Sequence, residues 1–416
     1  MPGRPASYRD VFAVREFRRL WMAHALSVIG DQLARVAITI LVYERTESAG
    51  LTALTYALTY IPDLIGGATL AGLADRFQRR MVMVVTDLAR AGLLVLMAVP
   101  GVPLAVQCGL LVLIQLLSAP FSSARQAVLA DMLSGDRLTI GIGAVSMTYQ
   151  AGLVIGFGTG AALVNQLGVS TALLIDASTF IVSAAIIRYG MSSYRPRPQQ
   201  DDKGQLSQWQ TIKAGWAIVA RDARLRTLLG IACCAGFYVV PEGLAVPYAA
   251  QIGASTMAVG WLLVANPIGT VIGMLALRSI SPRRRLMLMG PLAIASSLIL
   301  LPTGAAPGLT ATLILWTVSG MFSAHDMVTQ ATYVRLVPAH HRGQVIGVAI
   351  AALRLAQGLG IIVAGLLAQL LTPASIIAIA AAFGTVAAAI ATVRWNRAAP
   401  PHTVLPPQDE ADDIFD

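Results

Sequence analysis

Three ionisable residues of the first apolar stretch fall on one face of a helix. His24, Asp31 and Arg35 stand at positions i, i+7 and i+11 of a segment that is otherwise strongly apolar. In a helix these positions lie within about 40° of one another and form a polar stripe. The protonation of such a carboxylate depends on whether the arginine at i+4 is close to it. We therefore predict Asp31 as a proton-coupling site with Arg35 as its modulator; the alternative is a static Asp–Arg pair.

A second apolar stretch carries polar residues beside a proline. Tyr56, Tyr60 and Asp63 align at i, i+4 and i+7. The neighbouring Pro62 predicts a bend, because proline removes a backbone hydrogen bond from a helix. We expect this face to line a central cavity with the first stretch.

A third stretch combines a carboxylate with two prolines. Pro241 and Pro247 flank the middle of the segment that holds Tyr238 and Glu242, which predicts a broken helix with an acid at its centre. This pattern is typical of a gate or a substrate contact, although Glu242 could instead form a structural pair with Arg354. The side chains predicted to line the cavity and contact substrate are His24, Tyr56, Tyr60, Asp63, Tyr238, Glu242, His325, Asp326 and Arg354.

The charges in these stretches are unbalanced. Two arginines face four acids, which are Asp31, Asp63, Glu242 and Asp326. Such a cavity suits protons and cationic or zwitterionic substrates. His325 and Asp326 are adjacent, so they fall on different faces of a helix and one of them is expected to meet the cavity.

The composition shows which elements must position these residues. Only 12% of the 416 residues are charged, and the mean hydropathy is +0.69, whereas a soluble domain carries about 25% charged residues. Apolar windows of roughly 20 residues, enough to cross a ~30 Å hydrocarbon core as helix, recur along the chain. We predict an all-α integral membrane protein with twelve transmembrane helices, at 20–43, 50–73, 81–100, 103–124, 139–166, 168–190, 225–251, 255–278, 285–303, 308–334, 344–371 and 373–394.

The arginine clusters give the orientation of these spans. When twelve spans alternate, every cluster falls on one side, and only Arg45 lies on the other. The positive-inside rule therefore predicts cytoplasmic termini in the inner membrane of a prokaryote. This distribution explains the net charge of +9 without nucleic acid as a partner. The lipid bilayer is the expected environment.

The spans form two halves of six. Residues 1–19 precede the bundle 20–190, and a polar linker at 191–224 leads to the bundle 225–394. Apolar residues at helical spacing in the linker predict an amphipathic surface helix, and the acidic, proline-rich end 395–416 predicts a disordered tail. QAGLVIG at 150–156 and AQGLGII at 356–362 occupy matching places, so the halves are expected to be pseudo-symmetric.

A charged loop after the second span carries a family signature. The stretch AGLADRFQRR at 71–80 resembles the loop motif of the major facilitator superfamily, although Gly72 is shifted and Gln78 replaces a glycine. The resemblance implies a cytoplasmic gate that closes in one state and opens in the other. Its residues are Asp75, Arg76, Arg79 and Arg80, with Arg125 and Asp131 as partners and Asp87 and Arg90 as structural support. An ordinary basic loop would account for the arginines but not for Asp75.

The fifth span is similar to the antiporter motif of the same superfamily. Its glycines are Gly143, Gly152, Gly156 and Gly160, while Phe157 replaces the expected proline. Generic small-residue packing between membrane helices is the alternative. LSVIGDQ (26–32), YERTESA (43–49), DLARA (87–91) and APFSSARQAVLADML (119–133) resemble the proton-linked exporters that include macrolide-efflux and enterobactin-export proteins.

The sequence contains no motif for ATP hydrolysis, metal binding or disulfide bonding. The chain has no Gly-x-x-x-x-Gly-Lys phosphate loop, no zinc-ligand spacing, and three cysteines that suggest no disulfide framework. We expect neither an enzyme nor a cofactor or metal site. We expect a monomeric, proton-coupled exporter of amphipathic small organic molecules of the drug, antibiotic or siderophore class. The alternatives are an importer or lipid-handling transporter of the same fold, or a membrane sensor that transports nothing.

Overall fold

The computed structural model describes residues 7–70, 72–192, 208–338 and 341–398, without the side chains of Ala68, Asp75 and residues 208–211. The chain groups into two compact units. One comprises Met1–Gln205 with Ser255–Val264, and the other Leu206–Ala254 with Ala265–Asp416. The division falls within the predicted linker 191–224, and the start of the predicted span 255–278 groups with the first unit. The predicted tail lies outside the described residues from position 399 on.

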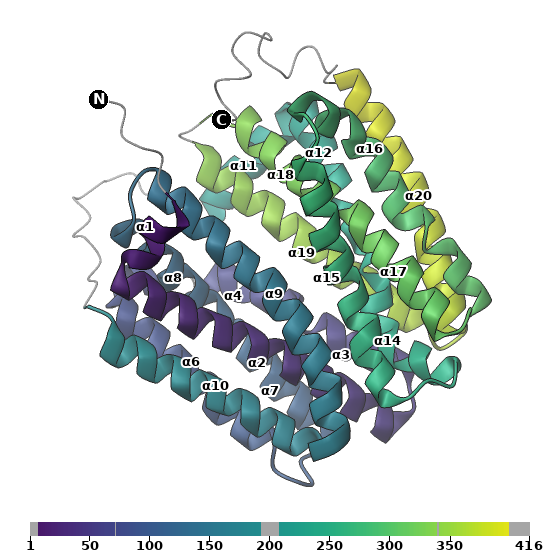
Figure 1. Ribbon diagram of the computed structural model, residues 1–416, viewed down its shortest axis with the longest axis horizontal. Coiled ribbons are helices and arrows are strands. Elements are labelled where there is room, and N and C mark those ends of the chain that lie inside the picture. Colours follow the sequence, from purple (N-terminus) through teal and green to yellow (C-terminus); the bar gives the residue numbers. More distant parts are fainter. Residues whose placement is uncertain (1–6, 71, 193–207, 339–340, 399–416) are drawn as a thin grey trace. The chain divides into compact units, whose positions relative to one another are not determined.

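Helices make up both units in the described part of the chain (Figure 1). The first unit contains α1 (Tyr8–Ala13), α2 (Arg15–Thr46), α3 (Ala49–Ala57), α4 (Ile61–Thr69), α5 (Leu73–Arg76), α6 (Arg79–Met97), α7 (Leu104–Leu116), α8 (Ser118–Met132), α9 (Asp136–Leu167) and α10 (Val169–Gly190). The later helices are α11 (Gln208–Arg221), α12 (Ala223–Cys233), α13 (Ala235–Tyr238), α14 (Val240–Gln251), α15 (Thr256–Arg278), α16 (Pro282–Leu298), the 3₁₀ turn η1 (Leu301–Ala305), α17 (Leu309–Ser323), α18 (His325–Leu336), α19 (Arg342–Leu367) and α20 (Pro373–Ala398).

Each of the twelve predicted spans corresponds to one helix or to consecutive helices. By length and apolar composition, eight helical stretches of the described chain qualify as membrane spans, and one of them, Asp136–Gly190, joins α9 to α10. The predicted spans that do not qualify are 50–73, 81–100 and 308–334. Of these, α6 carries several charges along its 19 residues.

The predicted breaks next to Pro62 and Pro241 are confirmed, whereas Pro247 lies inside the continuous helix α14. The second span divides into α3 and α4, with Pro62 in the first turn of α4. The seventh span divides into α12, α13 and α14, with Pro241 in the first turn of α14. Proline has no backbone N–H to donate and its ring clashes with the preceding turn, so the helix restarts at these positions.

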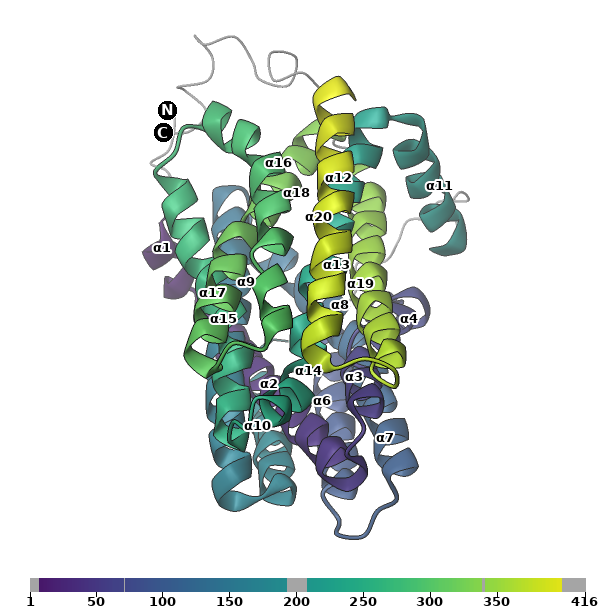
Figure 2. The ribbon, with the colours of Figure 1, turned by 90° about the vertical axis from the view of Figure 1, so that its right-hand side faces the viewer.

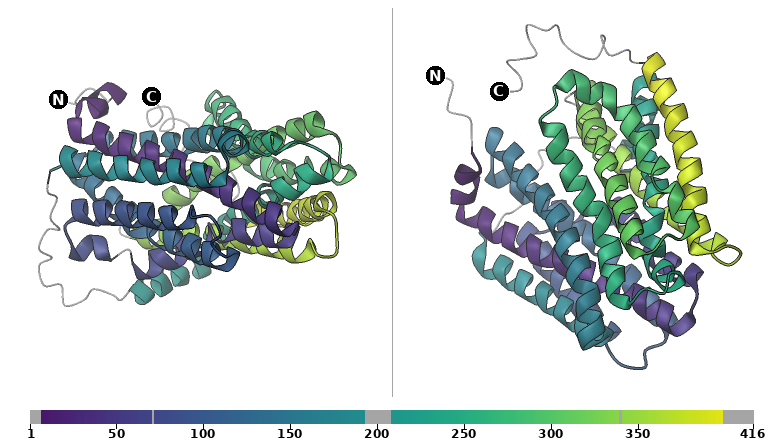
Figure 3. Two further views of the ribbon diagram at one scale, coloured as in Figure 1. Left: turned by 90° about the horizontal axis from the view of Figure 1, so that it is seen from below. Right: turned by 45° about the vertical axis from the view of Figure 1, so that its right-hand side comes forward.

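Helix packing repeats between the two units. In the first unit, α2 packs against α9 and α10, and α6 packs against α10 (Figures 1 and 3). In the second, α13 and α14 pack against α19, while α12 and α16 pack against α20 (Figure 2). Spans one, three, five and six therefore pair as spans seven, nine, eleven and twelve do. This repeat is the pseudo-symmetry that the sequence predicts.

The predicted surface helix is α11, which packs on the start of α19. Val219 is buried, and a Cβ on Gly215 would lie 2.8 Å from the carbonyl oxygen of Gln344. Ile212 and Trp216 remain exposed at 40% and 54%. One face of α11 is thus bound to the bundle while an apolar edge stays open, as expected for a helix at a membrane surface.

Candidate functional site

The hydrogen-bonded partner of Asp31 among the described residues is Arg90. Nη2 of Arg90, on α6, donates to Oδ1 of Asp31, on α2, over 2.5 Å. The Arg90 side chain is only 3% exposed, and that of Asp31 is 24% exposed. Arg35, the predicted modulator, interacts electrostatically with Asp31 but does not form this hydrogen bond. Arg90 forms it because its long side chain reaches the carboxylate from a neighbouring helix, whereas the i+4 rule considers one helix alone.

Arg35 instead lies over two aromatic rings. Its guanidinium carbon stands 5.5 Å from the ring centroid of Tyr56 and 5.6 Å from that of Tyr60. A cation over the face of an aromatic ring at this range is attracted by the ring's electron density. The structure thus brings together three of the residues predicted for the cavity face of the first unit.

Two more carboxylates surround Arg90. Asp87, also on α6, is fully buried and accepts a 2.6 Å hydrogen bond from Ser183, while its Oδ1 has no hydrogen-bond partner among the described residues. Asp176, on α10, is 1% exposed and accepts from Thr179 over 3.2 Å. Both acids interact electrostatically with Arg90. We call Asp31, Asp87, Arg90 and Asp176 the Arg90 cluster.

The Arg90 cluster differs from the sequence prediction in two ways. Asp87 and Arg90 were expected to support the gate, but they lie inside the bundle with Asp31. Asp176 was not singled out, although a lone aspartate in the apolar span 168–190 is itself a signal. A Cβ on Gly30 would lie 2.0 Å from Oδ1 of Asp176, so α2 and α10 approach closely at the cluster.

The remaining predicted polar residues of the first unit have other partners. His24 is buried and its ring nitrogens lie within hydrogen-bond distance of Nη1 of Arg125. Arg125 was predicted as a partner of the gate, and in the structure this nitrogen contacts His24. Asp63 accepts a hydrogen bond from the hydroxyl of Ser118, at the junction of α7 and α8. The three polar residues of α2 therefore contact different helices: Asp31 contacts α6, His24 contacts α8 and Arg35 contacts α3.

In the second unit, Asp326 joins two predicted residues. The hydroxyl of Tyr238 donates to Oδ2 of Asp326 over 2.5 Å. Nε2 of His325 lies 3.4 Å from Oδ1 of Asp326, and Nδ1 lies 3.0 Å from the carbonyl oxygen of Phe322. The His325 side chain is fully buried, whereas that of Asp326 is 28% exposed. The adjacent residues His325 and Asp326 therefore contact each other, and of the two only the Asp326 side chain is partly exposed. Glu242 and Arg354 lie on α14 and α19.

The predicted gate residues form contacts between neighbouring helices of the first unit. Arg79, at the start of α6, pairs with Asp131, near the end of α8. Arg80 donates to the carbonyl oxygen of Met191 over 2.9 Å, and Arg76 is exposed. Asp75 lies on α5, and its side chain falls outside the described part of the chain. The ion pair and the Arg80 contact tie α6 to α8 and to the end of α10.

Breaking the Arg79–Asp131 pair is expected to weaken the first unit. Removing one partner of a partly exposed pair leaves a charge without its neighbour, so Arg79→Gln should cost about 1 kcal/mol and lower the melting temperature by about 2–4 °C. Arg76→Gln, at an exposed site, is the matched control. A double-mutant cycle with Asp131→Asn checks the interaction, because coupled partners lose less together than the sum of the single losses. Additive losses would contradict the pairing.

Three glycines of the predicted motif on α9 face α2. Cβ atoms built on Gly152 and Gly156 would lie 2.4 Å from Cγ1 of Val28 and 2.6 Å from Cβ of Gln32, and a Cβ on Gly160 would touch Leu33. Gly143 has nothing within 4 Å of its Cβ position, so no neighbouring helix packs closely against this fourth glycine of the motif. The last three glycines of the motif, Gly152, Gly156 and Gly160, therefore lie in the interface between α9 and α2.

No group of three or more metal-ligating side chains occurs among the residues with described positions. The chemistry that the described site can perform is proton exchange at carboxylates and recognition of charged or hydrogen-bonding groups.

Comparison with known proteins places this geometry among transporters. The family model of the Major Facilitator Superfamily matches residues 20–305 and 240–414. The multidrug efflux pump Tap of Mycobacterium tuberculosis is 26% identical over 371 residues, which cover 82% of this chain and 84% of Tap. YkuC of Bacillus subtilis strain 168, an uncharacterised MFS-type transporter, is 27% identical over 297 residues, 66% of this chain and 67% of YkuC.

Solved structures share the fold at low sequence identity. A bacterial homologue of the human lysosomal transporter Spinster, in an inward-facing and unoccupied conformation, aligns over 94% of this chain and 97% of its own, with a TM-score of 0.64 and 17% identity. A POT family transporter in complex with 5-aminolevulinic acid gives a TM-score of 0.72 at 11% identity, over 92% of this chain and 97% of its own. These likenesses concern the fold alone.

Proposed function

The chain belongs to the Major Facilitator Superfamily, and from that premise we propose that it is a proton-coupled exporter of amphipathic small organic molecules. It is a multi-pass membrane transporter. The single observation that supports proton coupling is the Arg90 cluster, in which three buried or half-buried carboxylates surround one arginine. The chain would work by alternating access, as a monomer, with both termini in the cytoplasm of a prokaryote and without enzymatic activity.

The charge balance of the Arg90 cluster supports a proton-binding role. A charged group in an apolar interior is costly unless an opposite charge compensates it. One arginine can balance one of the three carboxylates, so the number of protons that they hold depends on where Arg90 is. Movement of α2 relative to α6 would lengthen the Asp31–Arg90 contact and thereby change the proton affinity of Asp31. Coupled groups of this kind share their protons instead of titrating one by one.

The direction of transport rests on the sequence relatives. Tap is described as a multidrug efflux pump, and it resembles this chain over most of its length. The structural neighbours include peptide transporters, but at sequence identities of 11–17% the likeness concerns the fold alone and carries no argument about the direction of transport. Export of drug-like molecules is therefore the proposed function, and uptake of a substrate or handling of lipid by the same fold is the alternative.

Accumulation of a fluorescent cationic dye and of an antibiotic panel in an efflux-deficient bacterium tests the direction. The proposal predicts lower accumulation with the transporter than with empty vector, and loss of the difference when an uncoupler collapses the proton gradient. Higher accumulation with the transporter would instead show uptake. A difference that persists with the uncoupler would contradict proton coupling.

Tyr238 and Asp326 are proposed as a substrate contact in the second unit. Tyr238→Phe removes the donor to Asp326 and leaves the ring in place, so we expect KM for a cationic substrate to change by about tenfold, because a hydrogen bond to a charged group contributes about 1.5–3 kcal/mol. Tyr333→Phe is the matched control, since the Tyr333 hydroxyl is buried on α18 without a hydrogen-bond partner among the described residues. Equal effects of the two substitutions on KM would contradict this assignment.

A further inference from the structure

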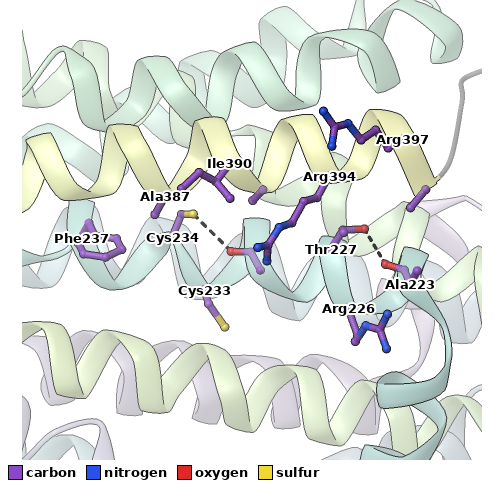
Figure 4. Close-up of a pocket in the computed structure, with 13 residues that line it drawn as sticks. Ala223, Arg226, Thr227, Cys233, Cys234, Phe237, Ala387, Ile390, Arg394 and Arg397 are labelled. Atoms are coloured by element: carbon purple, nitrogen blue, oxygen red, sulfur yellow. Dashed lines mark hydrogen bonds between the residues drawn. The ribbon is translucent and has the colours of Figure 1, made fainter.

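A pocket of the second unit lies between α12 and α20 and plays no part in the proposed transport mechanism. Its volume is about 920 Å³. Three arginines line one end, Arg226 from α12 and Arg394 and Arg397 from α20 (Figure 4). The other end is apolar and includes Phe237 and Ile390. The pocket therefore has a cationic end and an apolar end.

The three arginines have no carboxylate partner in the described chain. Arg226 donates to the carbonyl oxygen of Ala220, and neither Arg394 nor Arg397 forms an ion pair with a described residue. No acidic side chain lines the pocket. The three guanidinium groups point in different directions around this end of the pocket (Figure 4), and an anionic ligand would compensate their charge. Arginine is also the side chain that best matches the geometry of phosphate oxygens.

The apolar end of the pocket opens toward the expected lipid phase. Phe383, Val386, Ile390 and Val393 form an exposed apolar stripe along α20, with exposures of 49–65%. Ile390 belongs both to this stripe and to the pocket lining. A chain that enters the pocket can therefore continue along the lipid-facing surface of α20. The arginine end is the one that the topology prediction places at the cytoplasmic leaflet.

At the matching place of the first unit, an arginine lies against the end of a helix. Arg19 of α2 donates to the carbonyl oxygen of Gly190, at the end of α10, over 2.6 Å. Its Cδ would lie 2.6 Å from a Cβ on Gly190, so the arginine fits only because that position is a glycine. With the repeat spacing of 206 residues, the matching position on α20 is Asn396. At the same spacing Arg19 corresponds to Leu225, so the second unit has neither this arginine nor this glycine.

We propose that the pocket between α12 and α20 binds an anionic phospholipid, with two phosphates of a cardiolipin-like headgroup at Arg226, Arg394 and Arg397 and an acyl chain beside Ile390. Basic pockets between membrane helices at the cytoplasmic leaflet are suited to such headgroups. Charge complementarity, the apolar continuation and the lipid-facing position all favour a lipid over a soluble anion. The site is independent of the Arg90 cluster and of the direction of transport.

Native mass spectrometry of the purified full chain, titrated with cardiolipin or phosphatidylcholine, tests the proposal. We expect cardiolipin to be retained and phosphatidylcholine to be lost under the same conditions. Arg394→Gln/Arg397→Gln should bind cardiolipin about 30-fold more weakly, at about fivefold per charge. The matched control is Arg283→Gln/Arg284→Gln, which removes two exposed arginines outside the pocket and should leave binding unchanged. Equal losses in both double variants would overturn the site.

Three further arms separate the lipid from other occupants. Ala387→Phe fills the apolar end and should also reduce cardiolipin binding, whereas unchanged binding would exclude the acyl-chain contact. Glycerophosphate that binds as tightly as cardiolipin would show a site for soluble phosphates and overturn the proposal. A chain ending at Ala398 should retain the lipid as the full chain does. If cardiolipin binds only after this truncation, the acidic residues beyond Ala398 occupy the arginines in the full chain, and the lipid proposal is overturned.

Discussion

Asp31→Asn is expected to abolish proton-driven export. Asparagine has nearly the same shape and keeps an oxygen that can accept from Arg90, but it cannot bind and release a proton. It also removes the negative charge that Arg90 faces over 2.5 Å. Cells with the variant should accumulate transported dyes to the level of the empty vector, with no response to an uncoupler.

The structure also predicts which arginine matters most for coupling. Arg90→Gln should reduce uncoupler-sensitive efflux as strongly as Asp31→Asn, because it removes the only described ion-pair partner of Asp31. Arg35→Gln should reduce coupling less than Arg90→Gln and alter substrate affinity, because Arg35 acts on Asp31 without a hydrogen bond and also lies over Tyr56 and Tyr60. Asp222→Asn serves as the control for expression, because this carboxylate caps α12 outside the spans. Desolvation raises its pKa, but the hydrogen bonds and the charge of Arg224 together outweigh this effect and hold the pKa below the usual value. Loss of coupling in Arg35→Gln with normal coupling in Arg90→Gln would contradict the assignment.

Gly156→Val is expected to disrupt the packing of α9 against α2. A Cβ at this position would lie 2.6 Å from Cβ of Gln32 and 2.8 Å from the carbonyl oxygen of Ile29. Backbone atoms cannot give way as a flexible side chain can, so the two helices must separate. Overpacking of this kind costs about 1–3 kcal/mol, and for a bundle of this size the melting temperature should fall by about 2–4 °C per kcal/mol.

Gly143→Val is the matched control for this substitution. Both glycines belong to the same sequence motif on the same helix, but Gly143 has nothing within 4 Å of its Cβ position. Thermal unfolding in detergent, followed by the protein's own fluorescence, should show a large drop for Gly156→Val and little change for Gly143→Val. Similar melting temperatures for the two variants would contradict the described α2–α9 interface.

The arrangement of spans could be predicted from the sequence because it depends on local patterns. Apolar length gave the helices, the arginine clusters gave an expected orientation, and Pro62 and Pro241 marked breaks that the structure contains. The repeated motif at 150–156 and 356–362 also indicated a pairing, since α9 packs on α2 and α19 packs on α13. Each of these signals is contained in a short stretch of residues.

The partners within the site could not be predicted in the same way. Asp31 and Arg35 are four residues apart, so a rule for one helix joins them, but Arg90 reaches Asp31 from a helix almost sixty residues later. Arg125, predicted as a partner of the gate, likewise contacts His24 across α8 and α2. Such pairs depend on how helices rotate about their axes when they pack. Hydropathy and spacing do not specify that rotation, although an aspartate in an apolar span, such as Asp176, marks a buried polar site.

Proton movement during substrate transport tests the central claim most directly. The purified chain is reconstituted in liposomes that contain a pH-sensitive dye, and a transported cation is added without any imposed gradient. We predict that substrate movement drives opposite proton movement in the wild type, and that Asp31→Asn shows no proton movement while it still binds the cation. Proton movement of normal size in Asp31→Asn, or substrate movement without protons in the wild type, would contradict proton coupling through the Arg90 cluster.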